Sequence, residues 1–400
     1  MELLSKAKKI NMSNYLFYIA FFIELLLMII EKSELPFSYE SYVFRITFLL
    51  TMGAVLLMPH NKKEWLVIAI IWGLSIISYK SSGKNDLLRF TTFIMAARDI
   101  DIKKTIKYAF FTCLTGFGAI ALLAILRLYG DISLYTDFGR SVGNETRYVF
   151  GFGHPNTLFS SAYMLLIMWL WLYGESSKIY QLIITFLLMG IISVITVSRT
   201  GMLIISVTFI AAFIIKLFPD IKSYKAPYII TTVISPIICV IASILAAITS
   251  EMAYLETLPG VSSWYFFMLD EKLNYRISAL YFAPNHDGVL SHWKLFAAHD
   301  TDAYFDMGWV RIFYWYGIIP GTIITLLIIV FLWCCWRQKD LWTVLLILSL
   351  GVYTIIEATF VSRYIGRNIL LPVFGVYIGK LLTSSPIVPI EHQKDYQRCT

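Results

Sequence analysis

The sequence predicts an all-α integral membrane protein with about twelve transmembrane helices. The 400 residues are 58% hydrophobic and only 15% charged, whereas an average soluble domain is roughly 45–50% apolar and about 25% charged. The mean hydropathy is +0.70. Apolar runs of roughly 20 residues, the length of one span, recur from end to end. These observations exclude a soluble enzyme with a single anchor.

Twelve candidate spans emerge when the apolar runs are divided at charge clusters. The first is followed by "IIEKSELPF" rather than by a small-residue cleavage site, so we expect it to remain as a permanent helix. The fourth is the weakest, because it is short and contains Arg89. The predicted spans are residues 14–31, 41–58, 65–80, 85–99, 106–128, 157–174, 178–196, 199–217, 226–249, 308–335, 341–357 and 364–383.

The basic residues predict the orientation. With twelve spans, the basic clusters between them all fall on one side, which is then the cytoplasm, with both termini inside. Omitting the fourth span would move the cluster Lys103–Lys107 outside. The net charge of +7 is therefore explained by inner loops, and no nucleic-acid partner is expected. The clusters comprise Lys6, Lys8, Lys9, Lys62, Lys63, Arg98, Lys103, Lys104, Lys107, Lys178, Lys216, Lys222, Lys225, Arg337 and Lys339.

The chain is predicted to form one polytopic membrane domain over residues 1–400, with two long outer segments. Residues 129–156 form the first, and residues 250–307 form a larger one of short, partly amphipathic helices at the membrane surface. Residues 384–400 are predicted to be a cytoplasmic tail. The five cysteines show no CxxC spacing, so neither a disulfide framework nor a zinc site is expected.

The predicted outer face gathers arginines beside or within apolar runs. Charges in such places are costly and usually face a cavity or a partner; the alternative is that each side chain reaches the headgroups. A guanidinium matches phosphate oxygens and stays charged, so the set indicates a site for a lipid-linked diphosphate. "HDTD" at residues 299–302 is a weak metal motif, and no metal or other cofactor is expected. The arginines predicted on this face are Arg140, Arg147, Arg199, Arg276, Arg311, Arg363 and Arg367.

A sugar hydroxyl that attacks an anomeric carbon needs a proton acceptor. Asp306 lies where the second outer segment re-enters the membrane, and its alternative role is a helix N-cap. His154 stands between "GFG" and Pro155-Asn156, where it is either a substrate contact or a cap before the sixth span. The outer candidates are His154, His299, Asp300, Asp302, Asp306 and Glu357.

The ordered motifs "RYVFGFGHPN", "SRTG", "NYRISAL" and "DAYFDMGWVRIFYWYGIIPG" resemble those of Wzy-type polysaccharide polymerases, within the O-antigen polymerase and ligase superfamily. The "GFGHPN" version is similar to those of capsule and exopolysaccharide clusters. The likeness runs from about Arg89 to Asn368. Ligases of the superfamily show a histidine-asparagine pair at the late re-entry. Here Asp306 takes that place, which favours a polymerase.

The resemblance implies a membrane glycosyltransferase with a GT-C-like fold in the bacterial plasma membrane, with its active site facing outside. Such an enzyme polymerises undecaprenyl-diphosphate-linked oligosaccharide repeat units by inverting, metal-independent transfer and releases the lipid diphosphate. Donor and acceptor are both lipid-linked, and a chain-length regulator and a flippase are further partners that the family admits.

Carried onto this chain, the resemblance places Arg199 and Arg276 near the diphosphate, joined by Arg147. The full set of candidates divides by role. Catalysis is assigned to Asp306, His154 and Arg276, and substrate binding to Arg147, Asn156, Arg199, Arg311, His299 and Arg363.

Two other functions remain open at this point. The first is a ligase that moves the glycan to a different acceptor. The second is a flippase or secondary transporter, for which twelve spans and central arginines are also suitable. Transporters often have repeat-like halves with matching broken helices, whereas here polar residues gather on one face with a large outer segment late in the chain.

Overall fold

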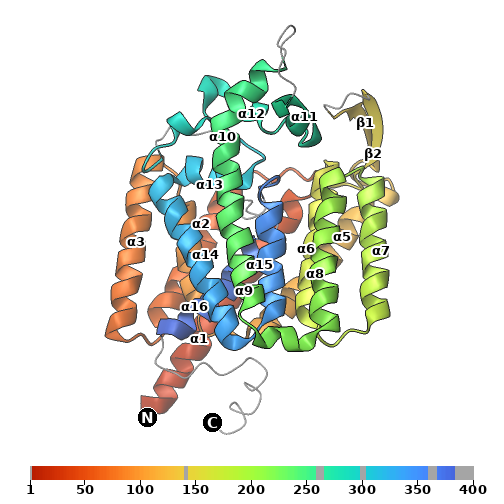
Figure 1. The fold of residues 1–400 in the computed structure, drawn as a ribbon. Helices are drawn as coiled ribbons and strands as arrows, with labels where there is room; N and C mark the ends of the chain where they lie inside the picture. The colour runs from red at the N-terminus through yellow and green to blue at the C-terminus, as the bar shows by residue number, and fades with distance from the viewer. Residues whose placement is uncertain (1, 139–142, 258–264, 298–302, 359–366, 383–400) are drawn as a thin grey trace.

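The computed structural model describes residues 2–138, 143–257, 265–297, 303–358 and 367–382. Over these residues the chain is a helical bundle with one short hairpin (Figure 1). The helices are α1 (Glu2–Glu31), α2 (Glu40–Leu57), α3 (Lys62–Ser82), α4 (Asp86–Ala96), α5 (Ile102–Ile125), α6 (Pro155–Tyr173), α7 (Ile179–Ile195), α8 (Arg199–Leu217), α9 (Ala226–Thr232), α10 (Cys239–Leu255), α11 (Tyr265–Lys272), α12 (Ser278–Phe282), α13 (Gly308–Tyr316), α14 (Ile318–Gln338), α15 (Leu341–Tyr353) and α16 (Arg367–Leu382), with short helical turns at Pro219–Ser223, Val233–Ile238, Pro284–His286 and Leu290–His292.

The predicted class of a multi-pass helical membrane protein is supported. In the described part of the chain, eight helices are long and apolar enough to cross a membrane, and three more are apolar but shorter. The predicted fourth span contains α4, which is only 11 residues long. Whether all twelve predicted stretches cross the bilayer stays a prediction, as does the GT-C-like arrangement.

The predicted tenth span, 308–335, is not one helix. It is divided into α13 and α14 at Gly317, whose φ is +99°. A Cβ at Gly317 would lie 2.6 Å from the carbonyl oxygen of Leu295, so only glycine fits this close approach. The amides of Ile318 and Ile319 donate to the carbonyls of Lys294 (2.9 Å) and Leu295 (3.1 Å). The preceding segment thus satisfies backbone groups that the break exposes.

The bundle has two distinct ends (Figure 1). Helix α1 begins at the lower end, where the loops after α6, α8 and α14 also lie. The hairpin, α11 and α12 lie at the upper end, called the hairpin end below. Loops that carry predicted inner basic clusters therefore share the end opposite the hairpin. Which end faces the cytoplasm stays a prediction, and the predicted tail 384–400 lies outside the described residues.

The hairpin is the one departure from the helical expectation among the described residues. Strands β1 (Ser133–Asp137) and β2 (Asn144–Tyr148) pair antiparallel inside the predicted outer segment 129–156. Leu134 faces Arg147 and Tyr135 faces Thr146 in the register. Successive side chains of a strand point to opposite faces, so Arg147 projects on one face of the hairpin and Tyr135 on the other.

Buried hydrogen bonds join the helices beneath the hairpin end. The Tyr163 hydroxyl of α6 pairs with Thr208 of α8 (2.6 Å), and Thr208 donates to Ser349 of α15 (3.1 Å). One turn higher, Ser160 pairs with Tyr353 (3.2 Å). Interhelical hydrogen bonds of this kind stabilise membrane bundles by roughly 0.6 kcal/mol each. They hold the start of α6 beside the end of α15, where the candidate site lies.

Candidate functional site

A polar cavity of about 210 Å³ lies at the hairpin end of the bundle. Its walls come from the hairpin, the starts of α6 and α8, the end of α11 and the segment before α13. Six of the nine site residues predicted from the sequence line it. Of the other three, Arg311 lies elsewhere, and His299 and Arg363 are outside the described residues. The lining residues are Phe138, Arg147, His154, Asn156, Ser198, Arg199, Thr200, Lys272, Asn274, Arg276 and Asp306.

Arg276 is a buried cation of the cavity. Its Nη2 donates to Oε1 of Glu357 at 2.5 Å, and its Nη1 donates to the carbonyl oxygen of Leu273 at 3.2 Å. Its Nε lies 3.5 Å from Oδ2 of Asp306 but has no hydrogen-bond partner. The guanidinium is thus held by the Glu357 carboxylate and the Leu273 carbonyl, and its buried Nε faces Asp306.

Glu357 lies just beyond the end of α15, beneath the cavity. Its Oε1 also accepts from the side-chain amide of Asn156 at 3.3 Å. Burial raises the pKa of Glu357 to about 7, although the neighbouring Arg276 acts in the opposite direction. This carboxyl group therefore changes charge near neutral pH and determines how much of the Arg276 charge is compensated.

Asp306 presents the accessible carboxylate. Its side chain is 49% exposed and lines the cavity. The alternative role of N-cap is wrong, because the residue before α13 in the cap position is Met307 and no side chain caps that helix. Helix α13 is anchored instead by its backbone, with the Gly308 amide donating to the Thr354 carbonyl at 2.9 Å. The carboxylate is therefore free of a capping role.

Arg147 reaches the cavity from β2. Its side chain is 4% exposed and pairs with Glu145, two residues earlier on the same face of the strand. The guanidinium also lies over the ring of Phe138, 3.9 Å from its centroid. Ion pairing and the aromatic contact fix the Arg147 side chain. Glu145 compensates much of its charge.

His154 caps α6. Its Nδ1 accepts a hydrogen bond from the backbone amide of Asn156 at 3.2 Å. The proton of the neutral ring is therefore on Nε2. Partial desolvation, and then the charge of Arg147, lower the pKa of His154, while Asp306 opposes them. The neutral ring thus offers an Nε2–H donor, and its one basic nitrogen is occupied by the cap. This geometry favours a donor over a proton acceptor.

Two cations of the cavity have no acidic partner in the described chain. Arg199 is the first residue of α8 and is exposed, with its backbone turn capped by Ser198, which accepts from the Gly201 amide at 3.1 Å. Lys272 ends α11 and is also exposed. Both line the cavity. Together they supply positive charge that no acidic side chain of the described residues pairs with, which favours the binding of an anion.

Arg311 does not line the cavity. Its guanidinium lies between the rings of Tyr304 and Trp315, at 4.0 and 3.7 Å from their centroids. Aromatic contacts of this kind accommodate a buried arginine without a counter-ion. From its position on α13, the Arg311 side chain points toward Tyr304 of the second outer segment. Packing between the two rings explains how a charged side chain is accommodated beside an apolar run.

The prediction missed Lys272, Asn274, Phe138, Ser198 and Thr200 as lining residues. Asn274 stands two residues before Arg276 in "NYRISAL", and Ser198 and Thr200 flank Arg199 in "SRTG", so their motifs carried the signal. Lys272 carried none, because a lysine at the end of a short surface helix is common. Glu357 was recognised as a possible proton acceptor, but its contact with Arg276 was not.

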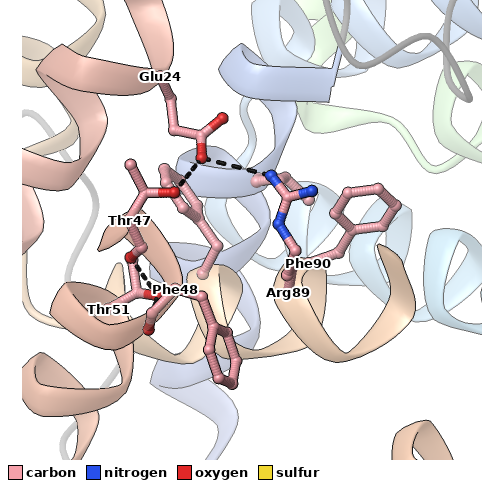
Figure 2. Close-up of a pocket in the computed structure, with 8 residues that line it drawn as sticks. Glu24, Thr47, Phe48, Thr51, Arg89 and Phe90 are labelled. Carbon is pink, nitrogen blue, oxygen red and sulfur yellow. Dashed lines mark hydrogen bonds and ion pairs between the residues drawn. The ribbon is translucent and has the colours of Figure 1, made fainter. Parts of the chain in front are cut away.

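A second, smaller cavity lies between α1, α2 and α4 (Figure 2). The Glu24 carboxylate accepts from Thr47 at 2.5 Å and faces Arg89 at 3.5 Å. The guanidinium of Arg89 also lies 3.7 Å from the centroid of Phe44. The volume of about 20 Å³ holds roughly one water molecule. The charge in the predicted fourth span is thus explained by a partly buried ion pair between helices, and the cavity is too small for a substrate.

No cluster of metal-ligating side chains is present among the described residues. The larger cavity offers one carboxylate among several cations, which is a poor donor set for a metal ion. In comparisons with known proteins, no family model, no curated protein and no solved structure matches this chain.

Proposed function

We propose that this chain is a membrane glycosyltransferase that polymerises lipid-diphosphate-linked oligosaccharide repeat units, with undecaprenyl diphosphate as the carrier. In this proposal the hairpin end faces outside the bacterial plasma membrane. The observation that carries the proposal is the cavity, where Arg147, Arg199, Lys272 and Arg276 surround one accessible carboxylate, Asp306.

The positive charges of the cavity support the binding of an anionic ligand whose phosphate groups leave during transfer. Arg199 and Lys272 have no acidic partner in the described chain, so they are available to phosphate oxygens. Arg276 lines the cavity beside them, with Glu357 and Asp306 as its ion-pair partners. Fixed donors of this kind stabilise negative charge as it develops, without reorganisation of solvent. A lipid-linked diphosphate combines such an anion with a tail that the surrounding apolar helices accommodate.

The proposed transfer follows from these positions. The acceptor hydroxyl oxygen bonds to the anomeric carbon of the donor sugar on the face opposite the diphosphate. The bond from that carbon to the phosphate oxygen breaks, and its electron pair leaves with the diphosphate, held by Arg199, Lys272 and Arg276. The hydroxyl proton passes to the Asp306 carboxylate. His154 donates from Nε2 to a substrate oxygen and keeps its cap to α6.

Purified protein in liposomes, supplied with lipid-linked oligosaccharide from a strain that lacks the chain, should produce a ladder of polymer. Arg199→Ala should lower kcat/KM for this donor about 10- to 100-fold, because one charge-assisted hydrogen bond to phosphate contributes roughly 1.5–3 kcal/mol. Folding should be unaffected, since Arg199 is exposed and pairs with no acidic side chain that the structure describes. Product is measured by gel electrophoresis.

Arg45 supplies the matched control, because it is an exposed arginine of α2 outside the cavity. Arg45→Ala should retain the wild-type rate. Transfer only to a different added acceptor, with no polymer, would identify a ligase. Movement of the lipid-linked oligosaccharide across the bilayer without bond formation would identify a flippase. Equal activity of Arg199→Ala and wild type would place the diphosphate elsewhere.

Glu357→Gln should remove a pH dependence of donor binding near neutrality. As the pH falls from 8 to 6, Glu357 takes up a proton, because its pKa is about 7. Arg276 then loses its counter-charge, so the KM for the anionic donor should fall several-fold in the wild type. The glutamine is neutral throughout, so the variant should keep the low KM at pH 8. An inflection near pH 7 that persists in the variant would assign it to another group.

A further inference from the structure

The backbone between α11 and α12 brings two side chains to the cavity, Asn274 and Arg276. It does so in an unusual conformation, with a φ of +60° at Asn274 and +58° at Tyr275. Left-handed backbone is unfavourable for residues other than glycine and persists only where surrounding contacts determine it. The path of residues 273–277 therefore depends on a partner elsewhere in the fold.

Asp270 of α11 is that partner. Its backbone carbonyl accepts a hydrogen bond from the Tyr275 amide at 2.8 Å. Its carboxylate accepts two more: Oδ1 from the Ile277 amide at 2.7 Å and Oδ2 from the Ser278 amide at 3.2 Å. The residues directly before and directly after Arg276 are thus both bonded to Asp270.

The Asp270 side chain is fully buried, with an exposed fraction of 0%. None of the ion pairs formed by the described residues includes it, so its charge is compensated by backbone amides. Burying such a charge is costly unless it is well hydrogen-bonded. An asparagine here could accept at only one atom, because its NH2 group is a donor. Of these two side chains of similar size, only the carboxylate satisfies both amides at once.

The hydrogen bonds to Asp270 fix the point from which the Arg276 side chain extends. That side chain reaches residues from late in the chain: its Nη2 donates to Glu357, and its Nε faces Asp306. A shift of the backbone at residue 276 would move the guanidinium relative to both carboxylates. Misplacement of a binding group by about 1 Å can cost on the order of 10²-fold in rate. The anchor of this backbone therefore affects what the cavity can bind.

We infer that Asp270 is a positioning residue of the site, which holds the Arg276 guanidinium against the diphosphate through the backbone on both sides of it. The inference rests on the proposed function and adds to it a residue that touches no substrate. Asp270 does not line the cavity, so its effect on a ligand passes through the segment that it anchors.

Asp270→Asn tests the inference with two probes, inorganic diphosphate and the extracted lipid-linked donor. The substitution keeps the size of the side chain but turns an NH2 donor toward a backbone amide. In titration calorimetry the Kd for diphosphate should rise about tenfold, the effect of weakening one charge-assisted hydrogen bond to phosphate. In the liposome assay kcat/KM for the donor should fall by at least as much. A purely structural role would lower the number of binding sites per protein and leave the Kd unchanged.

A double-mutant cycle shows whether Asp270 acts through Arg276. The background is Glu357→Gln, so that removal of Arg276 leaves no unpaired carboxylate beneath the cavity. Asp270→Asn should raise the Kd for diphosphate in this background, and should change it less than about twofold in Arg276→Ala/Glu357→Gln, where the positioned side chain is absent. An equal rise in both backgrounds would overturn the inference.

Asp340→Asn is the matched control. Asp340 caps α15 at the end of the bundle opposite the hairpin, and both of its oxygens accept hydrogen bonds from Thr343, at 2.9 Å from the amide and 2.7 Å from the hydroxyl. The control should lower thermal stability and leave the Kd for diphosphate as in wild type. If Asp270→Asn is not recovered from membranes, Asp270→Ser takes its place. Its hydroxyl can accept from one amide and places no NH2 group against the other, and it should give a similar rise in Kd.

The outcomes separate this inference from the proposed function. An Asp270 variant that folds, transfers glycan and binds diphosphate like wild type would overturn the inference while polymerisation stands. Absence of transfer by the wild-type protein would contradict the proposed function. Diphosphate binding that depends on Asp270 only when Arg276 is present would still support Asp270 as the positioning residue of an anion site.

Discussion

Arg276→Ala is expected to lower kcat/KM for the lipid-linked donor by two to three orders of magnitude. Loss of one preorganised donor to a developing anion costs a factor of about 10² to 10³ in other enzymes, and Arg276 combines a fixed guanidinium with a position beside Asp306. Initial rates in liposomes measure the effect. Arg276 is the best-supported member of the site because its geometry is determined by contacts from three sides.

The same substitution has a structural cost that must be separated from its effect on transfer. Alanine would leave the Glu357 carboxylate buried without its partner, which destabilises by roughly 3–5 kcal/mol. The double variant Arg276→Ala/Glu357→Gln removes the unpaired charge and leaves an amide oxygen for Asn156. Its thermal stability should return toward wild type while transfer stays lost. Recovery of activity together with stability would show that Arg276 acts only as a structural partner.

Asp306→Asn is expected to lower kcat about 10²- to 10⁴-fold, the usual contribution of a positioned general base. KM should change little, because the amide occupies the same volume. The fold should be unaffected, since the side chain is 49% exposed and caps no helix. Single-turnover measurements with one lipid-linked repeat separate the chemical step from chain growth.

The matched control is Asp131→Asn, an exposed aspartate that precedes β1 and does not line the cavity. It should be as active as wild type. An unchanged kcat in Asp306→Asn would exclude Asp306 as the proton acceptor. Glu357 would then be the remaining carboxylate beside Arg276 in the described chain, and its pKa of about 7 is suitable for that task.

Much of the candidate site was predictable because counting the spans of a multi-pass chain assigns each loop to one side of the membrane. Basic clusters on one side require Arg147, His154, Arg199, Arg276 and Asp306 to share the other, although they are far apart in sequence. Motifs such as "SRTG" then placed single residues at helix starts. The structure brings these five side chains to one cavity.

The side-chain contacts within and around the site could not be predicted, because they depend on the direction in which each side chain points. The pairing of Arg147 with Glu145 follows from strand alternation, which hydropathy does not reveal in a helical protein. Arg311 points to two aromatic rings because of its position on α13, and a one-residue shift of that helix would have changed its neighbours. The contact between Arg276 and Glu357 joins residues 81 apart, and no local pattern encodes it.

The break at Gly317 gives the late part of the chain a hinge-like joint made of main chain alone. Backbone amides and carbonyls, not side chains, tie the start of α14 to Lys294 and Leu295, and the end of α13 is tied in the same way to Ala297. The residues at positions 294 and 295 are therefore free to diverge without altering the path of the chain, whereas the glycine is not.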